Sequence, residues 1–71
     1  MVLEDFPPNM RTRQAALYLD ISESLLEKLR VVGGGPPYAK IGRSVVYRRH
    51  ALDAWLLESE LTSTSDRQLA A

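Results

Sequence analysis

The apolar positions in the first third of the chain repeat with the spacing of short helices. Ala15, Ala16 and Leu19 form a narrow apolar stripe, and Thr12, just before them, has the side chain of a good helix N-cap. We therefore expect a first helix at residues 13–19.

A second helix is predicted at residues 23–32, after a three-residue turn. In this turn Asp20 tolerates a left-handed backbone, Ile21 is apolar enough to point inward, and Ser22 can cap the following helix. The apolar side of that helix consists of Leu25, Leu26, Leu29 and Val32. Its opposite side consists of Ser24, Glu27, Lys28 and Val31. Such a pair is a helix-turn-helix unit, whose second helix can enter a DNA major groove.

A basic hairpin is predicted next. Glycines and prolines at 33–37 end the second helix, and residues 38–40 and 45–47 then read as two strands. A two-residue turn, Gly42-Arg43, would place Ile41 opposite Ser44. We favour a three-residue turn, because it aligns four side chains on one face: Ala39, Ile41, Val45 and Tyr47. The remaining side chains of the outer face and tip would be Tyr38, Lys40, Val46, Arg48 and Arg43.

A third helix is expected to begin at residue 49 or 50 and to end near residue 58. Its apolar positions recur at i, i+3 and i+4, which predicts a buried stripe of Leu52, Trp55 and Leu56. Trp55 is the largest of these and is predicted to be the largest core residue.

The segments on either side of these elements have no clear periodicity. Residues 1–10 are interpreted as an extended arm that docks Leu3 or Phe6 on the body or stays mobile, and residues 60–71 as a flexible tail that is disordered or weakly helical. A single folded domain at 11–59 remains. Its order of elements predicts an α+β fold, mainly helical, of the small winged helix-turn-helix type.

The size and composition of the chain favour a binding module over an enzyme. A domain within 71 residues has a small core with little room for a substrate cavity. The chain has no cysteine, and His50 is its only histidine, so we predict no catalysis, no metal site and no cofactor. No apolar run is long enough to span a membrane and no signal peptide is visible, so we expect a cytoplasmic, nucleoid-associated protein.

The charge of the chain is concentrated, although its net value is zero. Residues 11–49 hold eight of the nine basic side chains and only three of the nine acidic ones. This local excess is what binding to a polyanion requires, while clustered solvated faces would give the same pattern. Within it, Arg30 is typical of a solvated or locally paired charge, and Arg11 fits either interpretation.

The chain resembles the excisionase-like and AlpA-type DNA-binding domains, small relatives of the MerR winged helix. Three segments carry the resemblance, namely 12–22, 24–29 and 38–56, and its most specific part runs from Lys-Ile-Gly-Arg at residue 40 to Leu-Asp-Ala-Trp-Leu at residue 56. The resemblance implies a DNA-binding winged helix-turn-helix over residues 11–58.

Ten side chains are candidates for contact with double-stranded DNA: Thr12, Arg13, Gln14, Ser22, Ser24, Glu27, Lys28, Arg43, Arg48 and Arg49. Those at the start of the first helix can donate to phosphate oxygens. On the second helix, Lys28 could donate to guanine, Glu27 could accept from cytosine, and Ser24 could do either. The arginines of the hairpin are placed to reach the minor groove or its flanking phosphates.

Two roles follow from the resemblance. One is a recombination directionality factor, or excisionase, which bends attachment-site DNA and steers an integrase toward excision; the other is a transcription regulator. A domain this small reads few base pairs, so we expect several copies on repeated sites or a dimer. A different class also fits: an adaptor that binds proteins and has kept the fold without binding DNA, as the neutral charge and Glu27 allow.

Overall fold

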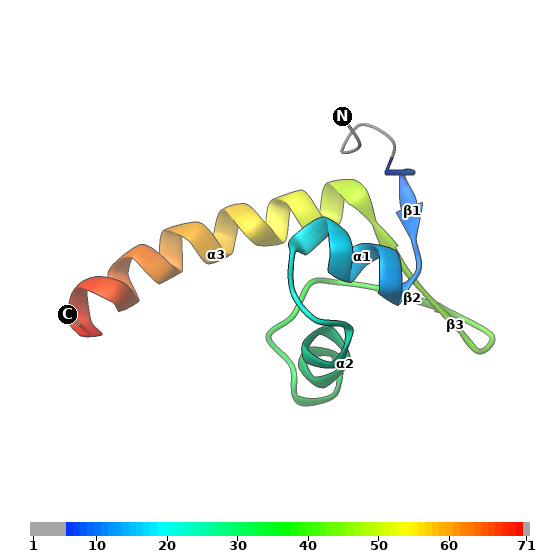
Figure 1. Ribbon diagram of the computed structural model, residues 1–71, viewed down its shortest axis with the longest axis horizontal. Helices are drawn as coiled ribbons and strands as arrows, with labels where there is room; N and C mark the ends of the chain where they lie inside the picture. Colours follow the sequence, from blue (N-terminus) through cyan, green and yellow to red (C-terminus); the bar gives the residue numbers. More distant parts are fainter. Residues whose placement is uncertain (1–5, 71) are drawn as a thin grey trace.

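The computed structural model describes the backbone of residues 6–70 and the side chains of residues 6–60. In chain order its elements are β1 (Asn9–Met10), α1 (Thr12–Leu19), α2 (Glu23–Val32), β2 (Ala39–Ile41), β3 (Ser44–Arg48) and α3 (Arg49–Ala70). The hairpin of β2 and β3 projects from one side of the body, and α3 leads away on the other (Figure 1). This arrangement confirms the predicted winged helix-turn-helix.

The α1–α2 unit folds around a left-handed residue and a capped helix start. Asp20 has φ 61° and ends α1, and the N–H of Ile21 then donates to the carbonyl of Ala16 at 3.0 Å. Ser22 accepts from the N–H of Leu25 at 3.0 Å, so it caps α2 as predicted. The start of α1 differs from the prediction: Thr12 is its first residue, and Arg11 occupies the N-cap position in an extended conformation.

Fewer apolar side chains of α2 are buried than its apolar stripe predicts. Only Leu26 of this helix is fully buried, while Leu25 is 42% exposed and Val32 is 67% exposed. Leu26 shares its buried cluster with Ala15 and Ala16, two small residues of α1. Leu25 and Val32 lie outside this cluster.

A third strand, absent from the sequence prediction, joins the hairpin. The sheet order is β1-β3-β2, with both pairs antiparallel. Met10 of β1 pairs with Tyr47 of β3, and its side chain is 1% exposed. The arm therefore supplies a core residue, and the backbone N–H of Arg49 donates to the carbonyl of Pro8 at 2.8 Å to hold it.

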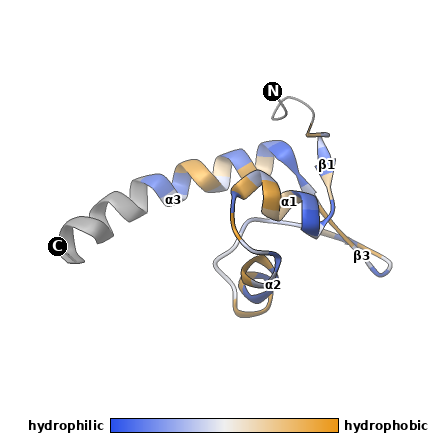
Figure 2. Cartoon of the chain, in the orientation of Figure 1, coloured by the Kyte–Doolittle hydropathy of each residue, from blue (hydrophilic) through white to orange (hydrophobic). Residues whose placement is uncertain are grey.

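The wing has the two-residue turn, not the favoured three-residue one. Ile41 pairs with Ser44, and Gly42 has φ 62°, a left-handed value that glycine adopts without strain at the first turn position. Tyr47 and Ile41 consequently lie on opposite faces, and Ile41 is 65% exposed. The apolar alignment that favoured the longer turn fails because the hairpin tip extends beyond the body. Figure 2 shows hydrophobic colour along the wing strands and a hydrophilic tip.

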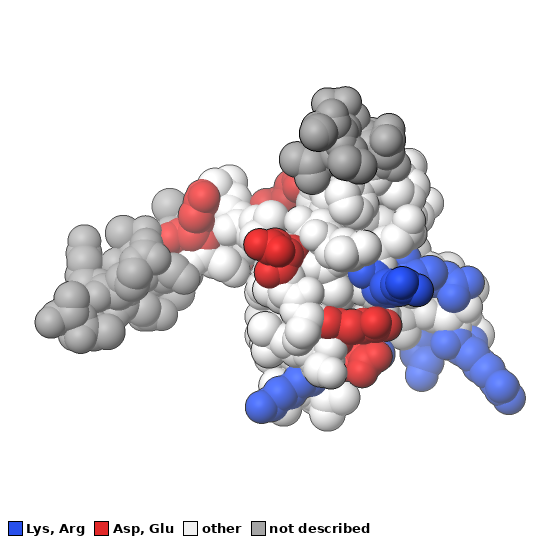
Figure 3. Space-filling view, in the orientation of Figure 1, with Lys and Arg blue, Asp and Glu red and all other residues white. Residues whose placement is uncertain are grey.

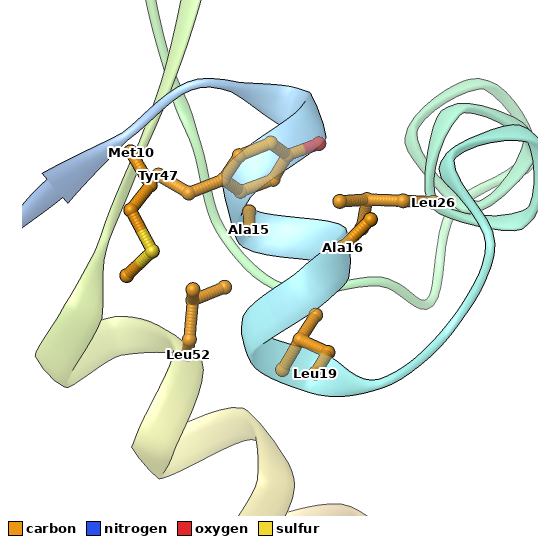
Figure 4. Close-up of a cluster of buried hydrophobic side chains, with 7 residues drawn as sticks. All are labelled: Met10, Ala15, Ala16, Leu19, Leu26, Tyr47 and Leu52. Carbon is orange, nitrogen blue, oxygen red and sulfur yellow. The ribbon is translucent and has the colours of Figure 1, made fainter. Parts of the chain in front are cut away.

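Among the side chains that the structure describes, seven form the core: Met10, Ala15, Ala16, Leu19, Leu26, Tyr47 and Leu52. They converge from the sheet and all three helices (Figure 4). Tyr47 is the largest fully buried side chain, so the expectation for Trp55 is wrong. Trp55 lies half-buried at the core edge because its Nε1 donates to the carbonyl of Gly34 at 3.0 Å, and Leu56 is 38% exposed.

The described part of the arm agrees with the prediction, and the third helix is longer than predicted. The ring of Phe6 packs edge-on against Tyr18, with centroids 5.1 Å apart, so Phe6 docks on the body as expected, while Leu3 lies outside the described residues. The hydroxyl of Tyr18 donates to Asp53 Oδ1 at 2.6 Å and links α1 to α3. Helix α3 continues to Ala70 instead of ending near Glu58. The flexibility of residues 60–71 stays a prediction.

Candidate nucleic-acid interface

The outward face of α2 carries the side chains predicted for base contact. Ser24, Glu27 and Lys28 are exposed, whereas Leu26 points into the core. Residues three, four and seven positions apart share one side of a helix, so Val31, which is 84% exposed, extends this side toward the helix C-terminus. We call the set Ser24, Glu27, Lys28 and Val31 the α2 outer face.

The side chain of Arg30 lies on the opposite side of α2 from the α2 outer face. It connects α2 by hydrogen bonds to the first residue of α1 and to the base of the wing. Its Nη1 donates to the hydroxyl of Tyr47 at 3.0 Å and to Thr12 Oγ1 at 3.3 Å. Its guanidinium lies over the ring of Tyr38, with Cζ 5.8 Å from the centroid. Arg30 was expected to be a solvated or locally paired charge, whereas its partners are two hydroxyl groups and an aromatic ring from residues distant in the chain.

The start of α1 presents donors suited to phosphate oxygens. Arg11, Arg13 and Gln14 are exposed. Thr12 is half-buried, and because its oxygen accepts from Arg30, its own hydroxyl hydrogen remains to be donated. Arg11 makes no side-chain cap hydrogen bond, which leaves first-turn N–H groups of α1 for a ligand.

The wing adds a second group of basic side chains. Arg43 lies in the tip turn, and Lys40 and Arg48 lie on its strands; all three are exposed. Figure 3 shows Lys and Arg gathered over the start of α1 and over the wing, with acidic side chains over α2 and along α3. The exposed basic residues of these two regions are Arg11, Arg13, Lys40, Arg43 and Arg48. We call them the basic flank.

Besides Thr12, which accepts from Arg30, two more of the ten candidates have structural contacts of their own. Arg49 is half-buried, and its Nη1 donates to the carbonyl of Phe6 at 2.8 Å, so this guanidinium holds the arm instead of standing free with Arg48. Ser22 accepts the capping hydrogen bond of α2, yet its hydroxyl hydrogen is still available to a ligand. The structure thus brings Thr12, Arg13 and Gln14 together on α1, and it places Arg49 beside Arg48 with one N–H group engaged by the arm.

The role of Arg30 was missed, although a signal for it existed. Arg30 follows Leu26 by four positions and so lies on the buried side of α2. A long side chain on that side must find polar partners at the edge of the core. Those partners are Thr12 and Tyr47, which lie 18 and 17 positions from Arg30 in the chain. Only the fold brings them to the guanidinium, so the sequence does not identify them.

This arrangement, a helix-turn-helix with an outward polar helix face beside a basic wing, is that of a DNA-binding domain. A family model described as a helix-turn-helix domain matches residues 10–59, and the chain belongs to this family. The match confirms the resemblance to the excisionase-like and AlpA-type domains and supports DNA as the partner. A comparison with curated proteins finds no match. Among the described residues, no helix is both long and apolar enough to cross a membrane.

Proposed function

We propose that the protein binds double-stranded DNA sequence-specifically, with α2 in the major groove and the basic flank on the neighbouring phosphates. The observation that carries this proposal is the division of charge: exposed arginines and lysine on α1 and the wing stand beside a polar, outward α2 face. Phosphate contacts from such side chains position a protein, and groove contacts specify the sequence. We propose no catalytic activity, because domains of this family are generally not enzymes.

Within DNA binding, we propose a role as an excisionase or as a transcription regulator of a mobile element. The resemblance to excisionase-like and AlpA-type domains supports both roles, and an integrase would be the partner of the first. An excision reaction with purified integrase and attachment-site DNA separates them. Stimulation of excision together with DNA bending supports the first role, whereas repression or activation of a promoter without any effect on excision supports the second.

Self-association on DNA is part of this proposal. One α2 helix of ten residues spans only a few base pairs, so selective binding requires several copies on repeated sites or a dimer. Binding of the full chain to duplexes that carry one, two and three repeats tests this. A steeper concentration dependence on the longer duplexes is expected, and identical curves per site would contradict it.

A second candidate, a protein-binding adaptor, is favoured by the acidic part of α2. Glu23 and Glu27 are exposed on this helix, and Asp20 is exposed just before it. These carboxylates repel a phosphate backbone unless α2 is oriented so that they point away from it. Titration of the full chain into duplex DNA at about 50 mM salt distinguishes the candidates, because only DNA binding should be detectable there and fall with added salt.

Two variants then test the residue assignments. Arg43→Ala should weaken binding to all duplexes alike, because a phosphate or minor-groove contact at the wing tip has little sequence content. Lys28→Ala should also change the preference among duplexes, because its position on the α2 outer face suits a base edge. Binding by both variants that equals that of the parent protein would overturn the assignments.

A further inference from the structure

The C-terminal half of α2 stands out because its outward surface is apolar. Val31 is 84% exposed, the highest exposure among the large hydrophobic side chains of the described residues. It belongs to the α2 outer face, three positions after Lys28, four after Glu27 and seven after Ser24. A valine at such a position contributes nothing to the core, since the buried side of α2 is held by Leu26.

The position of this half of α2 relative to the basic flank bears on its role. Arg30 donates to Thr12, the first residue of α1, and to Tyr47 on β3 of the wing. These bonds fix the C-terminal half of α2 between the two regions that carry the basic flank. The N-terminal half of the helix lies instead next to the turn, where Asp20 and Glu23 are exposed. Attraction to phosphates therefore directs DNA toward Lys28 and Val31, with the exposed carboxylate of Glu27 on the same face.

We infer that Val31 is a specificity-determining residue that reads the 5-methyl group of thymine in the major groove. The inference rests on the proposed DNA-binding function and names one chemical feature of its ligand. In the major groove the only apolar group on a base edge is the thymine methyl, and an apolar side chain is its complement. The side chain of Val31 is apolar, exposed and on the same helix face as three candidate hydrogen-bonding residues.

Uracil-containing DNA provides a direct test, because deoxyuridine differs from thymidine only by the missing methyl group. The probes are duplexes enriched by the full chain from a randomised pool, each made with thymidine and again with deoxyuridine throughout. The parent protein should bind the thymidine form about fourfold more tightly for each methyl that Val31 buries. Single replacements should trace the preference to one or two positions.

The variants are Val31→Ala and Val31→Thr, with Leu57→Ala as the matched control. Leu57 is 59% exposed on α3, so its truncation removes apolar surface away from α2. Both Val31 variants should bind the thymidine duplex more weakly than the parent protein and show a smaller preference for it over the deoxyuridine duplex, because each has less apolar surface to place on the thymine methyl. The control should keep the preference of the parent protein. Alanine is a better helix former than valine, so Val31→Ala should also remain folded.

Two outcomes would overturn the inference. The parent protein could bind both duplexes equally, or the Val31 variants could keep the full preference of the parent protein, whether or not their affinity falls equally on both duplexes. Failure of the proposed function has a different signature, since no duplex would then show salt-dependent binding to the parent protein, and the inference would fall with it. Unchanged DNA binding by Val31→Ala would assign the exposed apolar end of α2 to a protein partner.

Discussion

Replacement of Arg30 by methionine should destabilise the domain substantially, although Arg30 is not part of the buried cluster. The substitution keeps a long, flexible side chain but removes the donors to Tyr47 and Thr12 and the guanidinium over Tyr38. Tyr47 is only 1% exposed, and its hydroxyl then loses this hydrogen-bond donor. A lost hydrogen bond and a buried unpaired hydroxyl together cost about 2–3 kcal/mol.

For a domain of this size such a loss lowers the melting temperature by roughly 10–20 °C. Urea denaturation followed by circular dichroism should show a lower midpoint with an unchanged slope. Lys28→Met is the matched control, because it removes an exposed cation from the same helix and should change the free energy of unfolding by about 0.5 kcal/mol or less. If Arg30→Met and Lys28→Met are equally stable, the idea that Arg30 holds α2 to α1 and the wing is wrong.

Two further predictions concern side chains at the edge of the core. Trp55→Phe removes the indole donor to the carbonyl of Gly34, so it should cost about 1 kcal/mol and speed amide exchange in the loop 33–37; unchanged exchange would contradict this. The hydrogen bond to Asp53, together with burial and the charge of that carboxylate, raises the pKa of Tyr18 above its ordinary 10.0. The stability from this bond is therefore complete below pH 10 and is lost as the pH rises through the raised pKa. Tyr18→Phe should lack this alkaline loss relative to the parent protein, and parallel pH profiles would refute the assignment.

The helices and their caps could be predicted from the sequence because their signals are local. The left-handed Asp20, the capping Ser22 and the glycine that ends α2 each act within a few residues of the chain. Helix α2 has the predicted bounds, and Arg13, Gln14 and Lys28 lie exposed as a DNA contact requires.

The remaining features depend on contacts between distant residues. The pairing of Met10 with Tyr47 joins positions far apart in the chain, and a two-residue strand has no periodicity that would reveal it. The prediction of a three-residue wing turn is wrong because it assumes that Ile41 reaches the core. The hairpin tip extends beyond the core, and Ile41 is exposed. The place of Arg49 after the hairpin predicts a DNA contact, which stays a prediction, and its hydrogen bond to the backbone of Phe6 depends on the fold.

The salt dependence of DNA binding is the most direct test of the central claim, that the basic flank contacts phosphates. If all five of its side chains do so, the logarithm of the association constant should fall against the logarithm of the salt concentration with a slope of roughly −4 to −5. Arg13→Ala and Arg43→Ala should each reduce the slope by about one, and Leu57→Ala, which removes no charge, should leave it unchanged. Binding that is absent at low salt, or a slope that neither flank variant alters, would contradict the account.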